Sequence, residues 1–139
     1  MNSKVYYTSL GSFDTHDNQL VLHNKKLTEL NDALFSFYND IKQAKLLQNT
    51  TIVVFSEFGR RVKDNGNGTD HGTAAPVFII GGSNKLQIIG NNPNLNNLDN
   101  GDLKYEIDFR SVYASLLKQK MNFDASKIGI KNEPLKGLF

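Results

Sequence analysis

The chain of 139 residues contains no cysteine and no tryptophan, and only three prolines. The absence of cysteine excludes a disulfide scaffold, a thiol nucleophile and a zinc site built on thiolates. No apolar run approaches the roughly 20 residues that a membrane helix needs. Residues 1–9 also lack the basic start and the apolar stretch of a signal peptide. The length is close to that of the commonest domains and predicts one domain over residues 1–139.

The chain also lacks a large excess of charge of either sign. The chain has 16 basic and 14 acidic residues, so its net charge is +2. Neither half is strongly charged, because residues 1–70 hold eight basic and eight acidic side chains and residues 71–139 hold eight and six. We therefore expect no nucleic-acid partner and no membrane-binding patch, since both need a concentrated basic surface.

The apolar pattern predicts two helices and three strands. A stripe at the helical period runs from Leu20 to Ala44, and a second follows Asp108, a good N-cap residue. Residues 4–10 (KVYYTSL), 51–55 (TIVVF) and 76–80 (PVFII) are typical of strands. The last two are continuous apolar runs, as in parallel strands buried on both faces. Their alternation with helices predicts an α/β fold, a mostly parallel sheet flanked by helices.

Three residues in the loops at the ends of the expected strands have the types and spacing of metal ligands: Asp14 and His16 just after the first strand, and His71 just before the third. In such sheets ligands bind beyond the carboxyl ends of the strands. Asp14 and His16 are two residues apart, so in an extended segment both side chains point the same way. His71 can supply a third ligand, and an aspartate with two histidines and an open fourth position is a catalytic zinc shell. In the alternative interpretation, Asp14 caps a turn and His16 only hydrogen-bonds to it.

The segment after residues 51–55 offers a second group of candidates. A charge at the end of a buried strand is costly unless it is paired or binds a metal, so Glu57 is a candidate metal ligand or base. The alternative is an ion pair of Glu57 with Arg60 or Arg61. Both arginines can also clamp an oxyanion such as phosphate or sulfate. Residues 65–69 (NGNGT) tolerate positive φ, and they form either a turn that wraps a ligand or a plain surface turn.

Three segments taken together resemble a known family. Residues 11–16 (GSFDTH), 56–60 (SEFGR) and 67–76 (NGTDHGTAAP) resemble the domain-of-unknown-function family 1501, which is similar to the sulfatases of the alkaline phosphatase superfamily. Residues 102–105 and 108–113 fit the end region of that family. The resemblance implies a doubly wound α/β fold, of which this chain is the C-terminal portion, a partial alkaline-phosphatase-like fold. It also implies one or two divalent metals in enzymes that hydrolyse phosphate or sulfate esters.

The resemblance carries over residue by residue only in part. Asp14, His16 and His71 stand where one metal site of these enzymes has its ligands. The second site takes an Asp-His pair, but here that place is Glu57-Phe58, so its histidine is missing. The nucleophilic serine or threonine comes from a region upstream of the first segment, so the resemblance implies that this chain lacks it. Full-length relatives are usually exported, whereas the chain itself predicts no compartment.

The resulting prediction is a metal-binding, hydrolase-like domain for an anionic ester substrate, incomplete for catalysis as given. Asp14, His16 and His71 would hold one divalent cation, zinc by ligand type. Glu57 would be a fourth ligand or a base, and Arg60 would steady the anionic group. The alternative is a non-catalytic binding or assembly module that retains the fold. Without the upstream strands that the resemblance implies, one edge and one face of the predicted sheet would be uncovered. Either a homo-oligomer or the missing N-terminal half would cover them.

Overall fold

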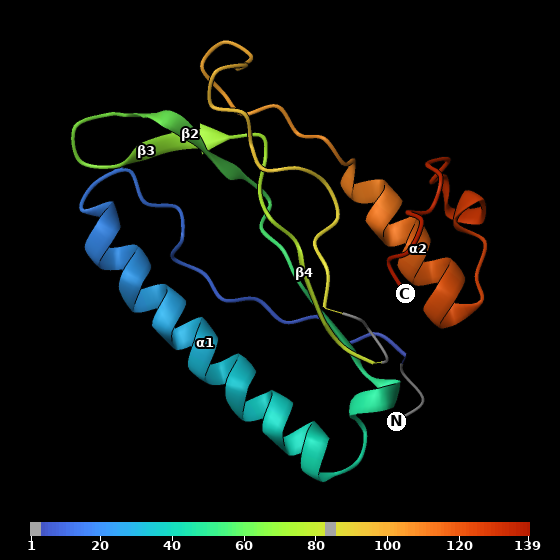
Figure 1. Ribbon diagram of the computed structural model, residues 1–139. Helices are drawn as coiled ribbons and strands as arrows, with labels where there is room; N and C mark the ends of the chain where they lie inside the picture. Colours follow the sequence, from blue (N-terminus) through green and yellow to red (C-terminus); the bar gives the residue numbers. More distant parts are fainter. Residues whose placement is uncertain (1–3, 83–85) are drawn as a thin grey trace.

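The computed structural model describes residues 4–82 and 86–139 (Figure 1). The helices are α1 (Gln19–Gln43) and α2 (Phe109–Met121), with two short 3-10 helices, η1 (Leu47–Asn49) and η2 (Ala125–Ile128). Between η1 and α2 lie four strands, β1 (Thr51–Val54), β2 (Gly59–Asp64), β3 (Thr69–Gly72) and β4 (Phe78–Gly81). No helix among the described residues is both long enough and apolar enough to cross a membrane.

Both predicted helices are confirmed. Helix α1 matches the apolar stripe to within one residue at each end. Helix α2 follows Asp108, whose side chain accepts a hydrogen bond from the backbone N–H of Arg110 and so caps the first turn. The helix ends at Asn122, which takes the left-handed conformation common at helix ends. The helical period is a local property of the sequence, and for this reason it locates both helices well.

The predicted mostly parallel sheet is wrong, and so is the partial alkaline-phosphatase-like fold that it was to form. The four strands make two antiparallel pairs, β1 with β4 and β2 with β3. The two apolar runs are neighbours, since Ile52 lies opposite Ile80, but they run in opposite directions. Parallel neighbours need a crossover, usually a helix. Residues 55–77 form no helix; they extend into β2, turn at residues 65–68 and return as β3.

The predicted strand at residues 4–10 is also wrong. Figure 1 shows this segment as a long trace without a strand arrow. Within the described part of the chain, its backbone takes part in no strand pairing. A run of β-branched and aromatic residues favours a strand, but the strand forms only when a neighbouring edge supplies the hydrogen bonds.

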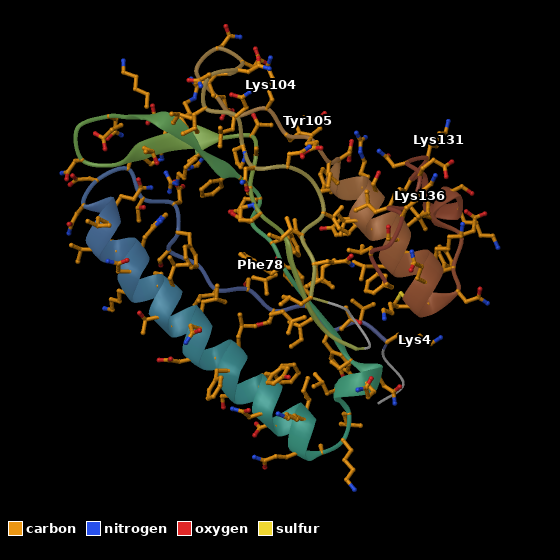
Figure 2. All side chains as sticks on the ribbon, in the orientation of Figure 1. Lys4, Phe78, Lys104, Tyr105, Lys131 and Lys136 are labelled. Carbon is orange, nitrogen blue, oxygen red and sulfur yellow. The ribbon has the colours of Figure 1, made fainter. Side chains whose placement is uncertain are left out.

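The core of the described structure is small. The hydrophobic side chains that are buried are Ile41, Val112, Ala114 and Ala125. Beside them, the hydroxyl of Ser115 is fully buried, donates to the Ser111 carbonyl and accepts from the backbone N–H of Leu135. The final segment is therefore tied to α2 by a hydrogen bond as well as by packing. Phe78 of β4, labelled in Figure 2, stays 57% exposed.

Candidate metal centre

Asp14, His16 and His71 converge, as predicted. Asp14 and His16 lie in the loop before α1, and His71 lies in β3. Oδ1 of Asp14 is 2.7 Å from Nε2 of His71 and 3.1 Å from Nε2 of His16. One ligand atom from each of the three residues lies within 4.8 Å of the others, so the cluster could hold a metal ion.

The spacing and the exposure of the three side chains suit a metal shell. In a tetrahedral shell with bonds of about 2.0–2.2 Å, neighbouring ligand atoms are roughly 3.3–3.6 Å apart. The two distances at Asp14 are slightly shorter, so small side-chain movements would admit an ion. All three side chains are exposed. Two imidazoles and one carboxylate thus leave a direction open to solvent for a further ligand.

The charge state of Asp14 favours cation binding. The hydrogen bond with His71 is the main cause that lowers the pKa of the Asp14 carboxyl below 3.8, and His16 adds a smaller effect in the same direction. Partial desolvation opposes them. The carboxyl is therefore ionised in neutral solution and needs to lose no proton before it binds a cation.

Arg60 joins the two segments that carry the ligands. Its Nη1 donates to the Thr69 carbonyl in β3, and its Nη2 donates to the Phe13 carbonyl in the loop, each at 2.6 Å. A weaker contact of 3.5 Å reaches Oγ1 of Thr15. The guanidinium thus holds the loop of Asp14 against the strand of His71. That Arg60 also steadies an anionic substrate stays a prediction.

The turn at residues 65–68 packs against the loop that precedes α1. The side-chain amide of Asn65 donates to the His16 carbonyl at 3.3 Å. The backbone N–H of Gln19, at the start of α1, donates to the Asn67 carbonyl at 3.2 Å. Gly68 fits against this loop, because an added Cβ would lie only 3.0 Å from the Gln19 side chain. The glycine and asparagine residues of the turn therefore help to place His16.

Phe58 contacts the candidate metal centre, whereas Glu57 does not belong to it. The ring of Phe58 stacks on His71, with centroids 3.8 Å apart. Glu57 is exposed and does not belong to the cluster of ligand atoms. Its predicted roles, fourth ligand or base, stay predictions. The Phe58 ring thus packs against one of the three candidate metal ligands.

The sequence predicted no role for Asp70 at the candidate metal centre. Its Oδ1 lies 3.4 Å from Nδ1 of His16, on the side of the ring away from Asp14. A carboxylate beside the second nitrogen of a ligating histidine orients the ring. No sequence signal pointed to this role, because Asp70 precedes His71 in the chain but acts on His16.

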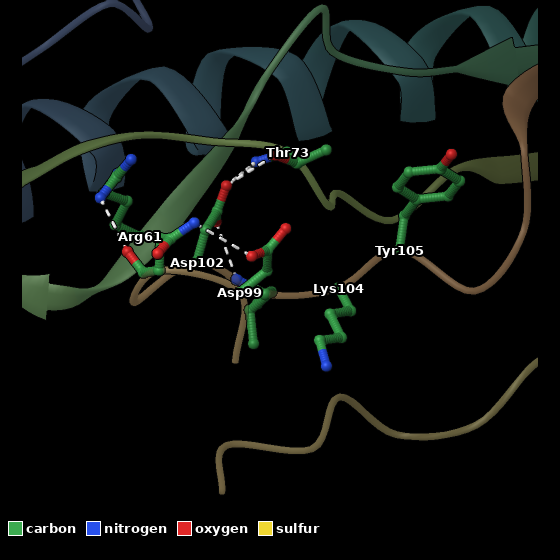
Figure 3. Close-up of a pocket in the computed structure, with 8 residues that line it drawn as sticks. Arg61, Thr73, Asp99, Asp102, Lys104 and Tyr105 are labelled. Carbon is green, nitrogen blue, oxygen red and sulfur yellow. Dashed lines mark hydrogen bonds between the residues drawn. The ribbon is translucent and has the colours of Figure 1, made fainter. Parts of the chain in front are cut away.

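Asp102 was named only through the resemblance and anchors the end of β3. Figure 3 shows it beside Thr73, whose N–H and hydroxyl both donate to its Oδ2, at 2.8 and 2.6 Å. The N–H of Leu103 donates to Oδ1. The hydroxyl of Thr73 is the main cause that lowers the pKa of the buried Asp102 carboxyl. A Cβ on Gly72 would lie 2.5 Å from Oδ1, so this approach requires glycine.

The pocket of Figure 3 lies next to this anchor. It is lined by Arg61, Thr73, Asp99, Asn100, Asp102, Leu103, Lys104 and Tyr105. None of the three predicted metal ligands contributes to the lining. The pocket and the candidate metal centre are therefore separate features.

Comparison with known families and proteins gives one match. The model of the family described as "Protein of unknown function (DUF1501)" matches residues 3–122. No curated protein and no solved structure matches the chain.

Proposed function

The chain belongs to the DUF1501 family, and we propose that it is a metal-binding domain related to the hydrolases of phosphate and sulfate esters. One observation carries the proposal. His71 comes from a strand more than fifty residues along the chain from Asp14, yet both lie with His16 in one cluster of ligand atoms. Arg60 and the turn at residues 65–68 hold these segments together through hydrogen bonds.

Zinc is the cation that this proposal names. Imidazole and carboxylate ligands in a four-coordinate shell with one open position are typical of catalytic zinc. A bound divalent cation would act there as a Lewis acid towards an oxygen of an anionic ester. The exposed side of the cluster supports access by such a substrate.

We propose that the chain binds metal more readily than it turns over substrate. Thr15, the hydroxyl next to Asp14 in the sequence, faces the Arg60 guanidinium at 3.5 Å. Both terminal nitrogens of Arg60 already donate to backbone carbonyls. Turnover of an aryl phosphate or sulfate at or near background is therefore the expected result.

A non-catalytic binding module is the second candidate. The observation that favours it is Phe58, whose ring stacks on His71 where the related enzymes have a metal-binding histidine. A metal that serves only structure would raise stability without any turnover. Zinc-dependent turnover of an aryl phosphate or sulfate above background would exclude this second candidate, whereas turnover at background is the result that both candidates expect.

The test of metal binding is a thermal shift with and without zinc. A ligand at one hundred times its Kd stabilises the folded state by about 2.7 kcal/mol, which raises the Tm of a chain of this size by roughly 10 °C. We expect that shift in the unaltered protein and its loss in His71→Ala. The control is His23→Ala, because His23 lies outside the cluster. Equal shifts in all three proteins would contradict the proposal.

A further inference from the structure

The molecule exposes far more surface than a compact chain of its mass. Its accessible surface is 10736 Å², whereas a compact protein of 15.6 kDa exposes about 7,200 Å². The excess of roughly 3,500 Å² exceeds the 800–2,500 Å² that each partner buries in stable dimers. The surface thus offers enough area for an extensive interface.

Residues 4–10 are the part of this surface best suited to pairing. Val5, Tyr6 and Tyr7 are exposed by 68%, 72% and 79%. The described structure gives the backbone of this segment no hydrogen-bond partner. The segment has strand-forming residues, one charge and neither proline nor glycine. Unpaired backbone groups beside exposed apolar side chains are a template for pairing with another strand.

The segment is complementary to itself. In an antiparallel pair about a two-fold axis at Tyr7, all seven residues find a partner: Tyr7 lies opposite Tyr7, Tyr6 opposite Thr8, and Val5 opposite Ser9. Aromatic pairs across strands are stabilising. Each Lys4 lies opposite a Leu10, and the two lysines are about 20 Å apart, where salt screens their repulsion. The small net charge of +2 opposes association only weakly.

We propose that residues 4–10 pair with the same residues of a second copy of this chain, forming a two-fold dimer through an antiparallel strand pair. The pairing satisfies the backbone groups on one edge of the segment and brings the two Tyr7 rings together across the strands. It uses none of the metal-centre residues, so it stands or falls independently of the proposed function. The dimer forms with zinc and equally with a chelator present.

A charge exchange at Tyr7 tests the dimer. Light scattering on the full chain should give twice the 15.6 kDa of one chain. Tyr7→Lys and Tyr7→Glu each place like charges opposite one another, so each variant alone should dissociate with a Kd raised at least about tenfold. An equimolar mixture of the two should restore the dimer, because opposite charges then meet. Tyr105→Lys, which adds a charge at another exposed tyrosine, should leave the dimer unchanged.

Three outcomes would overturn the proposal. The first is an unaltered chain that light scattering shows as a monomer over the whole concentration range, which would mean that a different polypeptide covers residues 4–10. The second is a dimer that persists in both Tyr7 variants alone, which would place the contact elsewhere. The third is a mixture that stays monomeric although circular dichroism shows both variants as helical as the unaltered chain.

Discussion

The rings of Phe58 and His71 lie nearly parallel, with their centroids 3.8 Å apart and 8° between their planes. The guanidinium of Arg60 lies 5.1 Å from the centre of the Phe58 ring. Phe58 thus fixes the plane of a proposed metal ligand and contacts the residue that joins the two ligand segments. An aromatic residue at this position supports the metal centre by packing.

We expect Phe58→Ala to weaken zinc binding about two- to thirteenfold, because an aromatic stack contributes roughly 0.5–1.5 kcal/mol. His71 would then sample other rotamers before it binds the ion. Competition with a coloured chelator measures the affinity. Phe55→Ala is the matched control, since Phe55 packs against Tyr113 instead of the metal centre. A loss as large in Phe55→Ala would attribute the effect to general destabilisation.

Arg60→Gln should destabilise the fold and weaken zinc binding together. The substitution removes two charged hydrogen bonds to backbone carbonyls, each 2.6 Å long, and we expect a loss of about 2 kcal/mol in the free energy of unfolding. Urea denaturation measures it. Arg61→Gln is the control, because Arg61 is exposed and makes a single bond of 3.3 Å to the Asn100 carbonyl. Similar losses in both variants would refute the joining role of Arg60.

Asp102→Ala should cost about 2–3 kcal/mol of unfolding free energy, because it leaves the donors of Thr73 and Leu103 without their buried acceptor. Asp99→Ala removes a carboxylate from the same pocket and should change stability by less than about 0.5 kcal/mol. Chemical denaturation of the two variants checks the difference. If Asp99→Ala proved the more damaging, Asp102 would not be the anchor of β3.

Stability should fall in acid through Asp108. Hydrogen bonds from Arg110 lower the pKa of the Asp108 carboxyl from 3.8 to about 2. Because the folded state has the lower pKa, the stabilisation is complete above about pH 4 and is lost as the pH falls towards 2. Urea denaturation of the unaltered chain and of Asp108→Asn should give a difference that shrinks over this range. Asparagine still caps the helix, so the comparison isolates the charge.

Local patterns in the sequence were enough to predict both helices and the three residues of the candidate metal cluster. The stripe of α1 and the cap at Asp108 are local patterns, and helical hydrogen bonds join residues only four apart. Asp14, His16 and His71 were identified by their residue types and their places in loops at the ends of the expected strands. Family membership over residues 3–122 agrees with the motifs that the sequence offered.

The direction of the strands and the lack of strand pairing at residues 4–10 depend on contacts between segments far apart in the sequence. An apolar run such as 51–55 reads the same in a parallel and in an antiparallel pair, and the turn at residues 65–68 settles which one forms. Residues 4–10 have the composition of a strand, but pairing depends on a partner edge that composition does not describe. The roles of Arg60 and Asp70 were likewise hidden, since they arise from contacts between segments far apart in the chain.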